Sequence, residues 1–149
     1  MGEVIEGVSG SAVRAARDVV VAFGRLRRRL REVSDGQDLT PSQASVLSRL
    51  GKDGASSASA LAVAEHVRPQ SMAVILAALD QRALIQRDPD PEDGRRQLVT
   101  LTEAGRERAQ GNRQAKEEWL VRALHDRCTE KQRRVVIEAM AVLESLSHE

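Results

Sequence analysis

Residues 84–101 read LIQRDPDPEDGRRQLVTL, a run in which two short segments flank a turn-rich centre. Asp, Pro and Gly crowd the centre at positions 88–94, which excludes a helix there. The residues after it alternate in polarity and include β-branched side chains, as strands do. The sequence therefore predicts a small hairpin with strands at Ile85–Asp88 and Arg96–Leu101.

Helical signals precede this hairpin. Thr40 can cap a helix that Pro41 opens, and Gln43 completes a capping box. That helix is predicted to end at Gly51 and to be followed by a Gly/Ser/Ala-rich loop at 54–57.

A short helix is expected next, around Ala58–His66, and Pro69 opens another after a tight connection. Two short helices joined by a tight turn and followed by a hairpin form a winged helix-turn-helix. The apolar side of the short helix is predicted at Leu61, Ala62 and Val63 or Ala64. In the second helix Met72, Ile75, Leu76, Leu79 and Ala83 are predicted to face inward, and Gln70, Ser71, Ala73, Val74 and Ala77 to face outward.

Longer helices flank this centre. Apolar residues recur at helical spacing from Ser11 to Val33, and Ser34-Asp35-Gly36 gives a turn signal after them. Thr102 begins another helix, predicted to reach about Leu124, and Thr129 caps a last one. These helices are too long and apolar for a winged helix of roughly 60–70 residues, so they need partners. Their apolar faces are Val19, Phe23, Leu26, Leu30 and Val33 in the first helix, and Val135, Val136, Ala139, Met140, Val142, Leu143 and Leu146 in the last.

Composition limits the class of protein. The chain has 149 residues, 41% of them hydrophobic, and a net charge of +1, which suits one domain and excludes a polybasic tail or an acidic disordered chain. It contains no apolar run of about 20 residues and opens on an acidic segment, so we expect neither a membrane span nor a signal peptide. A single cysteine is consistent with the cytoplasm. Aromatic residues make up 1%, too few for stacking on single-stranded nucleic acid.

Arginine is concentrated near the start of the chain. Between Arg14 and Arg31 there are seven Arg and one acid, Asp18, a local charge of +6. One interpretation is that these arginines lie on a solvated helix face and pair with side chains of neighbouring helices. The other is that they form a basic surface that lies near a polyanion.

Two short segments carry the candidate chemistry. At the start of the second short helix, Arg and Gln can pair with guanine and adenine, Ala73 can meet a thymine methyl, and Ser71 can hold a phosphate with the helix N-terminus. The alternative is that Pro69, Gln70 and Ser71 are ordinary helix-start residues. At the hairpin tip, Arg95 can enter a minor groove if Asp93 hydrogen-bonds and orients it. The alternative there is a self-neutralised surface loop.

These segments, together with 39–43, 60–62 and the run from Leu98 to Arg106, resemble the MarR (multiple antibiotic resistance regulator) family. The resemblance spans roughly residues 11–147 and is specific from about 39 to 106. Its most specific element is the Asp-Pro-x-Asp-x-Arg wing followed by Leu-Thr-x-x-Gly.

The resemblance implies a mainly α, winged helix-turn-helix (α+β) regulator, acting as a homodimer on a palindromic operator in double-stranded DNA. It implies dimerisation helices at 11–38 and 102–149 and the winged helix-turn-helix at 39–101. The glycines of residues 1–10 and their lack of pattern predict a flexible tail there. We expect a repressor, released by a small anionic or aromatic effector bound between the dimerisation helices and the winged helix. Gly94 departs from the family, in which many members carry a basic residue there, and Arg96 can replace that contact. The candidate DNA-binding residues are Arg68, Pro69, Gln70, Ser71, Ala73, Asp93, Arg95 and Arg96.

Other functions find little support in the sequence. The three histidines, His66, His125 and His148, lack ligand spacing to one another or to Cys128, so no metal, cofactor or enzyme activity is expected. Cys128 is interpreted as a buried or incidental thiol. Trp119 is expected in the core or the dimer interface. The competing function is a winged helix that binds protein, favoured by the zero net charge of residues 68–96.

Overall fold

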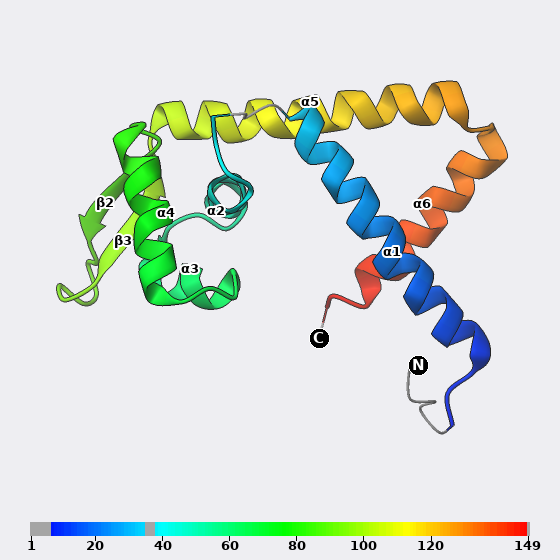
Figure 1. Cartoon of the computed structure of the whole chain (residues 1–149), viewed down its shortest axis with the longest axis horizontal. Helices are drawn as coiled ribbons and strands as arrows, with labels where there is room; N and C mark the ends of the chain where they lie inside the picture. The colour runs from blue at the N-terminus through cyan, green and yellow to red at the C-terminus, as the bar shows by residue number, and fades with distance from the viewer. Residues whose placement is uncertain (1–6, 35–37, 149) are drawn as a thin grey trace.

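A computed structural model describes residues 7–34 and 38–148 of the chain (Figure 1). Within this part, six helices and a small antiparallel sheet agree with the predicted winged helix-turn-helix flanked by long helices. Asp35 and Gly36 of the predicted turn, and most of the predicted tail, lie outside the described residues. In chain order the elements are α1 (Gly10–Val33), α2 (Pro41–Asp53), β1 (Ser56–Ser57), α3 (Ala58–Ala64), α4 (Pro69–Gln81), β2 (Ile85–Pro89), β3 (Gln97–Leu101), α5 (Glu103–Arg127) and α6 (Glu130–Ser145).

The helix starts follow from their caps. Thr40 Oγ1 accepts a hydrogen bond from the Gln43 amide at 3.2 Å, and the Gln43 side chain accepts one from the Thr40 amide at 3.1 Å. This reciprocal pair confirms the predicted capping box. Thr129 caps α6 as predicted and forms a second such box with Gln132. α1 begins at Gly10, one residue earlier than predicted, because the Ser9 side chain caps it.

The sheet has the strand order β1-β3-β2 with both pairings antiparallel. The predicted hairpin is confirmed to within one residue at its strand ends: β2 extends to Pro89, and β3 begins at Gln97 instead of Arg96. β1 lies inside the segment that the sequence predicted as a loop. It has only two residues, paired with Leu98 and Val99 of β3, and two residues carry no periodic pattern that sequence analysis can detect.

The hydrophobic core belongs to the winged helix. Every buried apolar side chain in the described part of the chain lies between Leu39 and Leu101. Met72, Ile75, Leu76 and Leu79 are buried as predicted, and the other face of α4 is largely exposed. The predicted core position Ala83 is wrong. It lies beyond the end of α4, exposed, with a left-handed φ of 56° that turns the chain toward β2.

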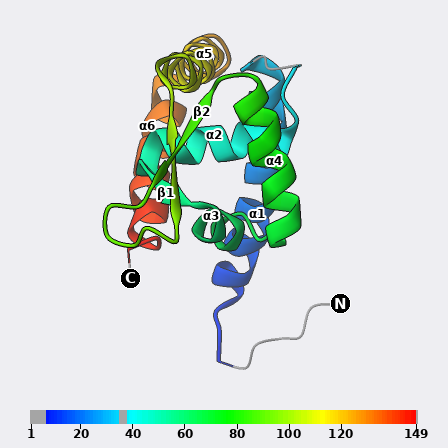
Figure 2. The same ribbon diagram turned by 90° about the vertical axis from the view of Figure 1, so that its left-hand side faces the viewer.

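The long helices extend away from this core. α5 crosses the top of the molecule in Figure 1, and α1 and α6 descend from it on the side away from the sheet. α1 and α6 cross only in projection, because Figure 2 separates them. Neither helix contains a buried residue, and in α5 only Gly105 is buried. Phe23 and Met140, on the predicted apolar faces, are 45% and 43% exposed. No helix in the described residues combines the length and apolar character needed to cross a bilayer.

Candidate nucleic-acid interface

The start of α4 presents its polar side chains to solvent. Arg68 is the N-cap residue, but no side chain caps the helix, so its first amides remain available to a ligand. Pro69 occupies the first turn, and Met72 turns inward to the core as predicted. The predicted contact residues Arg68, Pro69, Gln70, Ser71 and Ala73 are all exposed.

A four-residue connection, residues 65–68, sets the angle between α3 and α4. The Glu65 amide donates a hydrogen bond to the Leu61 carbonyl at 2.9 Å, which ends α3. The Val67 amide donates one to the Ala62 carbonyl at 3.0 Å. His66 between them has a left-handed φ of 55°. The sequence placed His66 at the end of the short helix, whereas the structure ends α3 at Ala64 and uses His66 to reverse the chain.

Glu65 anchors this turn to α2. Its carboxylate accepts hydrogen bonds from Ser45 Oγ and Arg49 Nε, both at 2.8 Å, and its side chain is only 12% exposed. Burial alone would raise the pKa of Glu65, but the hydrogen bonds from Arg49 and Ser45 outweigh burial and lower it below its usual value of 4.5. Glu65 is therefore charged in the folded protein, and its hydrogen bonds fix the turn that sets the direction of α4.

The wing tip is shaped by its own carboxylates. Asp90 Oδ1 accepts a hydrogen bond from the Glu92 amide at 2.9 Å, and Asp93 Oδ1 accepts one from the Arg95 amide at 3.1 Å. Each carboxylate thus bonds the amide two residues further on, which is how Asp stabilises turns. The prediction that Asp93 orients the Arg95 side chain needs correcting, because Asp93 holds the backbone of Arg95 and leaves its guanidinium free.

The two predicted contact segments come together on one side of the winged helix. Figures 1 and 2 both place the wing tip and the N-terminal end of α4 at the end remote from α5. Arg68, Arg95 and Arg96 are exposed there, and none of the three forms an ion pair with a carboxylate of the described residues. One face therefore carries a helix end with free amides and three free guanidinium groups.

Comparison with known proteins identifies the family of this chain. The MarR family profile matches residues 39–96, the segment from the start of α2 to the wing tip. An HTH-type transcriptional regulator of Mycobacterium leprae is 40% identical over 114 residues, which cover 76% of this chain and 80% of the relative. The chain belongs to the MarR family. It is therefore a transcriptional regulator of that family.

Solved structures extend the likeness of this MarR-family regulator to the long helices. A transcriptional regulator protein from Pseudomonas aeruginosa superposes with a TM-score of 0.80 at 31% identity, covering 95% of this chain and 99% of the other. A mutant of MepR from S. aureus, solved bound to an oligodeoxyribonucleotide, shares the fold with a TM-score of 0.63 at 19% identity. That match covers 89% of this chain and 98% of MepR.

Sequence analysis missed an ion-pair bracket between the winged helix and α5. Asp38, just before α2, pairs with Arg82 at the end of α4 at 3.0 Å and with Arg108 of α5 at 2.5 Å. The hydrogen bond from Arg108 lowers the pKa of Asp38, and Arg82 adds to the effect. The partners lie 44 and 70 residues from Asp38, so no local sequence pattern reveals them. The bracket ties the C-terminal end of α4 to the long helix α5 of this MarR-family chain.

Cations of three helices surround the junction above the winged helix. Burial lowers the pKa of Lys116 in α5, and the neighbouring charges of Lys52, Arg27 and Arg31 lower it further. A different arginine of α1, Arg29, lies over the ring of Trp119 at 5.6 Å, a cation–π contact that joins α1 to α5. The arginines of α1 therefore do not all have the same surroundings: Arg27 and Arg31 are exposed but act on Lys116, whereas Arg29 contacts Trp119.

Proposed function

We propose that this MarR-family regulator binds a palindromic operator in double-stranded DNA as a homodimer and represses transcription. The observation that carries the proposal is the shared face of the α4 start and the wing tip, with its three unpaired arginines. The DNA-bound MepR structure, which has the same fold, supports it.

In this proposal α4 enters the major groove by its N-terminal end. Arg68 and Gln70 pair with guanine and adenine edges, and Ala73 contacts a thymine methyl. Pro69 fixes the start of the helix, and the Ser71 hydroxyl and the uncapped amides bind a backbone phosphate.

The wing lies against the neighbouring minor groove. Arg95 enters that groove, where the negative potential of the DNA is enhanced, and Arg96 supplies the second positive charge that Gly94 does not. Asp93 acts through the turn it orders and not through contact with DNA, since its carboxylate is engaged by the Arg95 amide.

A second copy of the chain covers the exposed apolar faces of α1 and α6. Within one chain these faces have no buried residue, which is unfavourable in water unless a partner covers them. A twofold dimer then presents two copies of α4 to half-sites about one helical turn apart, roughly 10 base pairs.

Replacing Arg95 by Ala tests the DNA-binding function. Duplexes that bind the wild-type protein are first selected from a random-sequence library, and their affinities are measured at several salt concentrations. Arg95→Ala is expected to weaken binding about tenfold and to reduce the slope of log affinity against log salt by about one. Arg113→Ala, on the exposed surface of α5 and paired with Glu117, is the matched control. Equal affinities and slopes for the two variants would remove the wing from the interface, and the absence of any bound duplex would reject the function.

A small anionic or aromatic effector releases the protein from DNA. The positive charges of Lys52, Arg27 and Arg31 around the half-buried Lys116 support an anionic effector, because a bound carboxylate offsets them. A tenfold loss of DNA affinity requires only about 1.4 kcal/mol of coupling. Calorimetric titration with benzoate and phenolic carboxylic acids is expected to give heat with the wild type and much less with Lys116→Met. No heat from any of these acids with the wild type would contradict the proposal.

The second candidate function is a winged helix that binds another protein. It is favoured by the charge of residues 68–96, in which five arginines balance five acids. Retention on heparin or nonspecific duplex separates the two functions, because DNA binding predicts elution that shifts with salt. A protein-binding module predicts no retention at low salt.

A further inference from the structure

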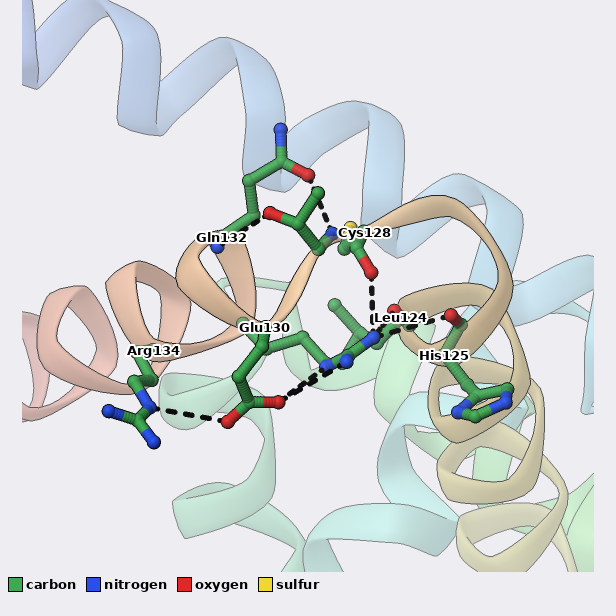
Figure 3. Close-up of polar contacts among 8 residues, drawn as sticks. Leu124, His125, Cys128, Glu130, Gln132 and Arg134 are labelled. Carbon is green, nitrogen blue, oxygen red and sulfur yellow. Dashed lines mark hydrogen bonds and ion pairs between the residues drawn. The ribbon is translucent and has the colours of Figure 1, made fainter.

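The corner between α5 and α6 is held by one arginine side chain. Only Cys128 and Thr129 separate the two helices, so the last carbonyls of α5 lack partners within their own helix. Arg133, in the first turn of α6, reaches back to them. Its Nη1 donates to the carbonyl oxygens of Cys128 at 2.6 Å, Leu124 at 3.1 Å and His125 at 3.3 Å, which converge at this corner in Figure 3.

The remaining nitrogens of Arg133 are fixed by Glu130. Nε and Nη2 donate to Glu130 Oε2 at 3.3 and 3.2 Å, while Glu130 Oε1 accepts from Arg134 Nε at 3.2 Å. The two neighbouring arginines thus share one carboxylate but differ in reach. Arg133 is 31% exposed and joins both helices, whereas Arg134 is 74% exposed and none of its described contacts reaches α5.

Side-chain packing within one chain does not fix the direction of α6. No residue of α6, all of which the structure describes, is buried. The angle at the corner therefore depends on the two-residue connection, the Thr129 capping box and the guanidinium of Arg133.

A small change of this angle has a large effect at the DNA. α5 has 25 residues and is about 37 Å long at about 1.5 Å per residue. The winged helix joins its far end. A tilt of about 10° at the corner moves that end by about 6 Å, close to two base-pair steps of about 3.4 Å each.

We propose that Arg133 is a positioning residue that sets the distance between the two winged helices of the dimer and hence the half-site spacing that the regulator prefers. The inference rests on the proposed function, in which α6 forms part of the dimer and α4 contacts DNA. Arg133 itself lies at the opposite end of α5 from the winged helix and acts only through the angle of α5.

The test compares Arg133→Met with Arg134→Met. Both variants lose one positive charge and an ion pair with Glu130, but only the first loses the hydrogen bonds to the Leu124 and His125 carbonyls of α5. Affinity is measured for a duplex selected by the wild-type protein and for derivatives in which the half-site spacing is one or two base pairs longer or shorter. Arg133→Met is expected to bind the selected spacing about tenfold more weakly and to lose most of the discrimination between spacings. Arg134→Met keeps the wild-type profile.

A second measurement needs no DNA. Spin labels at Val63→Cys in a Cys128→Ser background report the distance between the winged helices of a dimer. The distribution is expected to broaden or shift in Arg133→Met and to stay narrow in Arg134→Met. If Arg133→Met does not fold or dimerise, Arg133→Lys replaces it, because a lysine keeps the charge but not the fork that reaches several carbonyls.

The outcomes separate this inference from the proposed function. A wild-type protein that selects no duplex, or that remains monomeric, rejects the proposed function. A different result rejects only the role of Arg133. In that result the wild type prefers one spacing, but the Arg133 variant has the same spacing profile and the same label distances as Arg134→Met.

Discussion

At the scale of single residues, the acids near the interface are occupied within the protein. Asp90 and Asp93 bond amides of the wing turn, and Glu65 bonds Ser45 and Arg49 of α2. Asp90 and Asp93 are two of the five acids that balance the five arginines of residues 68–96. They keep their negative charge, but their hydrogen bonds order the backbone of the turn that carries Arg95 and Arg96.

Glu65 provides a prediction of pH dependence. Its pKa is lowered in the folded protein, so its contribution to stability is present above the unfolded value near 4.5 and is lost as pH falls through the lower folded value. We expect Glu65→Gln to cost about 1–2 kcal/mol at pH 7 and to reduce the loss of stability below pH 4.5. Urea unfolding across this pH range measures both effects. Glu117→Gln, in an exposed pair on α5, should change the free energy of unfolding by less than about 0.5 kcal/mol at pH 7.

At the scale of elements, the junction between the sheet and α5 needs a glycine. Thr102 caps α5 and donates from its hydroxyl to the Ala83 carbonyl at 2.6 Å and from its amide to the Leu84 carbonyl at 3.1 Å. These bonds hold the first turn of α5 against the start of β2. A Cβ on Gly105 would overlap the Leu84 carbonyl oxygen. The glycine of the Leu-Thr-x-x-Gly motif therefore permits this close approach.

Two glycines of the same helix make a matched pair for testing that junction. Gly105→Ala is expected to lower the free energy of unfolding by about 3 kcal/mol, because the obstructing atom is backbone and cannot move aside cheaply. At Gly111 a Cβ meets nothing within 4 Å, so Gly111→Ala should raise stability by up to about 1 kcal/mol. Thermal and urea unfolding of both variants check the pair. Similar changes in the two would contradict a packing role for Gly105.

Elements with local signals were predictable, and those that depend on distant partners were not. The caps at Thr40 and Thr129 have side-chain partners three residues away, so sequence analysis found both helix starts. The short strand β1 forms only because β3 lies beside it, and Ala83 leaves the helix because the chain must turn to β2. The bracket at Asp38 spans 44 and 70 residues. The exposure of Gln70, Ser71 and Ala73 was predictable from the helical period, but the position of the Arg95 guanidinium, which Asp93 does not contact, was not.

At the scale of the whole molecule, one chain buries its core in the winged helix and leaves its long helices uncovered. α1 and α6 stand apart in Figure 2, and both carry apolar side chains in solvent. Association of two chains would then determine how far apart two winged helices are held. In the proposed dimer, the bracket at Asp38 links α5 to α4 within each chain, and Arg133 links α6 to α5.

The apolar face of α6 therefore carries the last prediction. Val136 and Met140 lie on its predicted stripe and are exposed in the single chain. If a second copy covers them, the double variant Val136→Glu/Met140→Glu places two carboxylates in an apolar interface and should raise the dimer dissociation constant at least about tenfold, because unpaired buried charge is costly. Sedimentation equilibrium at micromolar protein measures the change. Val63→Glu, at a valine of α3 in the winged helix that is 76% exposed, should leave the dimer intact. An unchanged dimer in the double variant would place the contact between chains elsewhere. Loss of the dimer with an unchanged circular dichroism spectrum, and hence an unchanged helix content, would show that α6 holds the two copies together and is not needed for the fold of each.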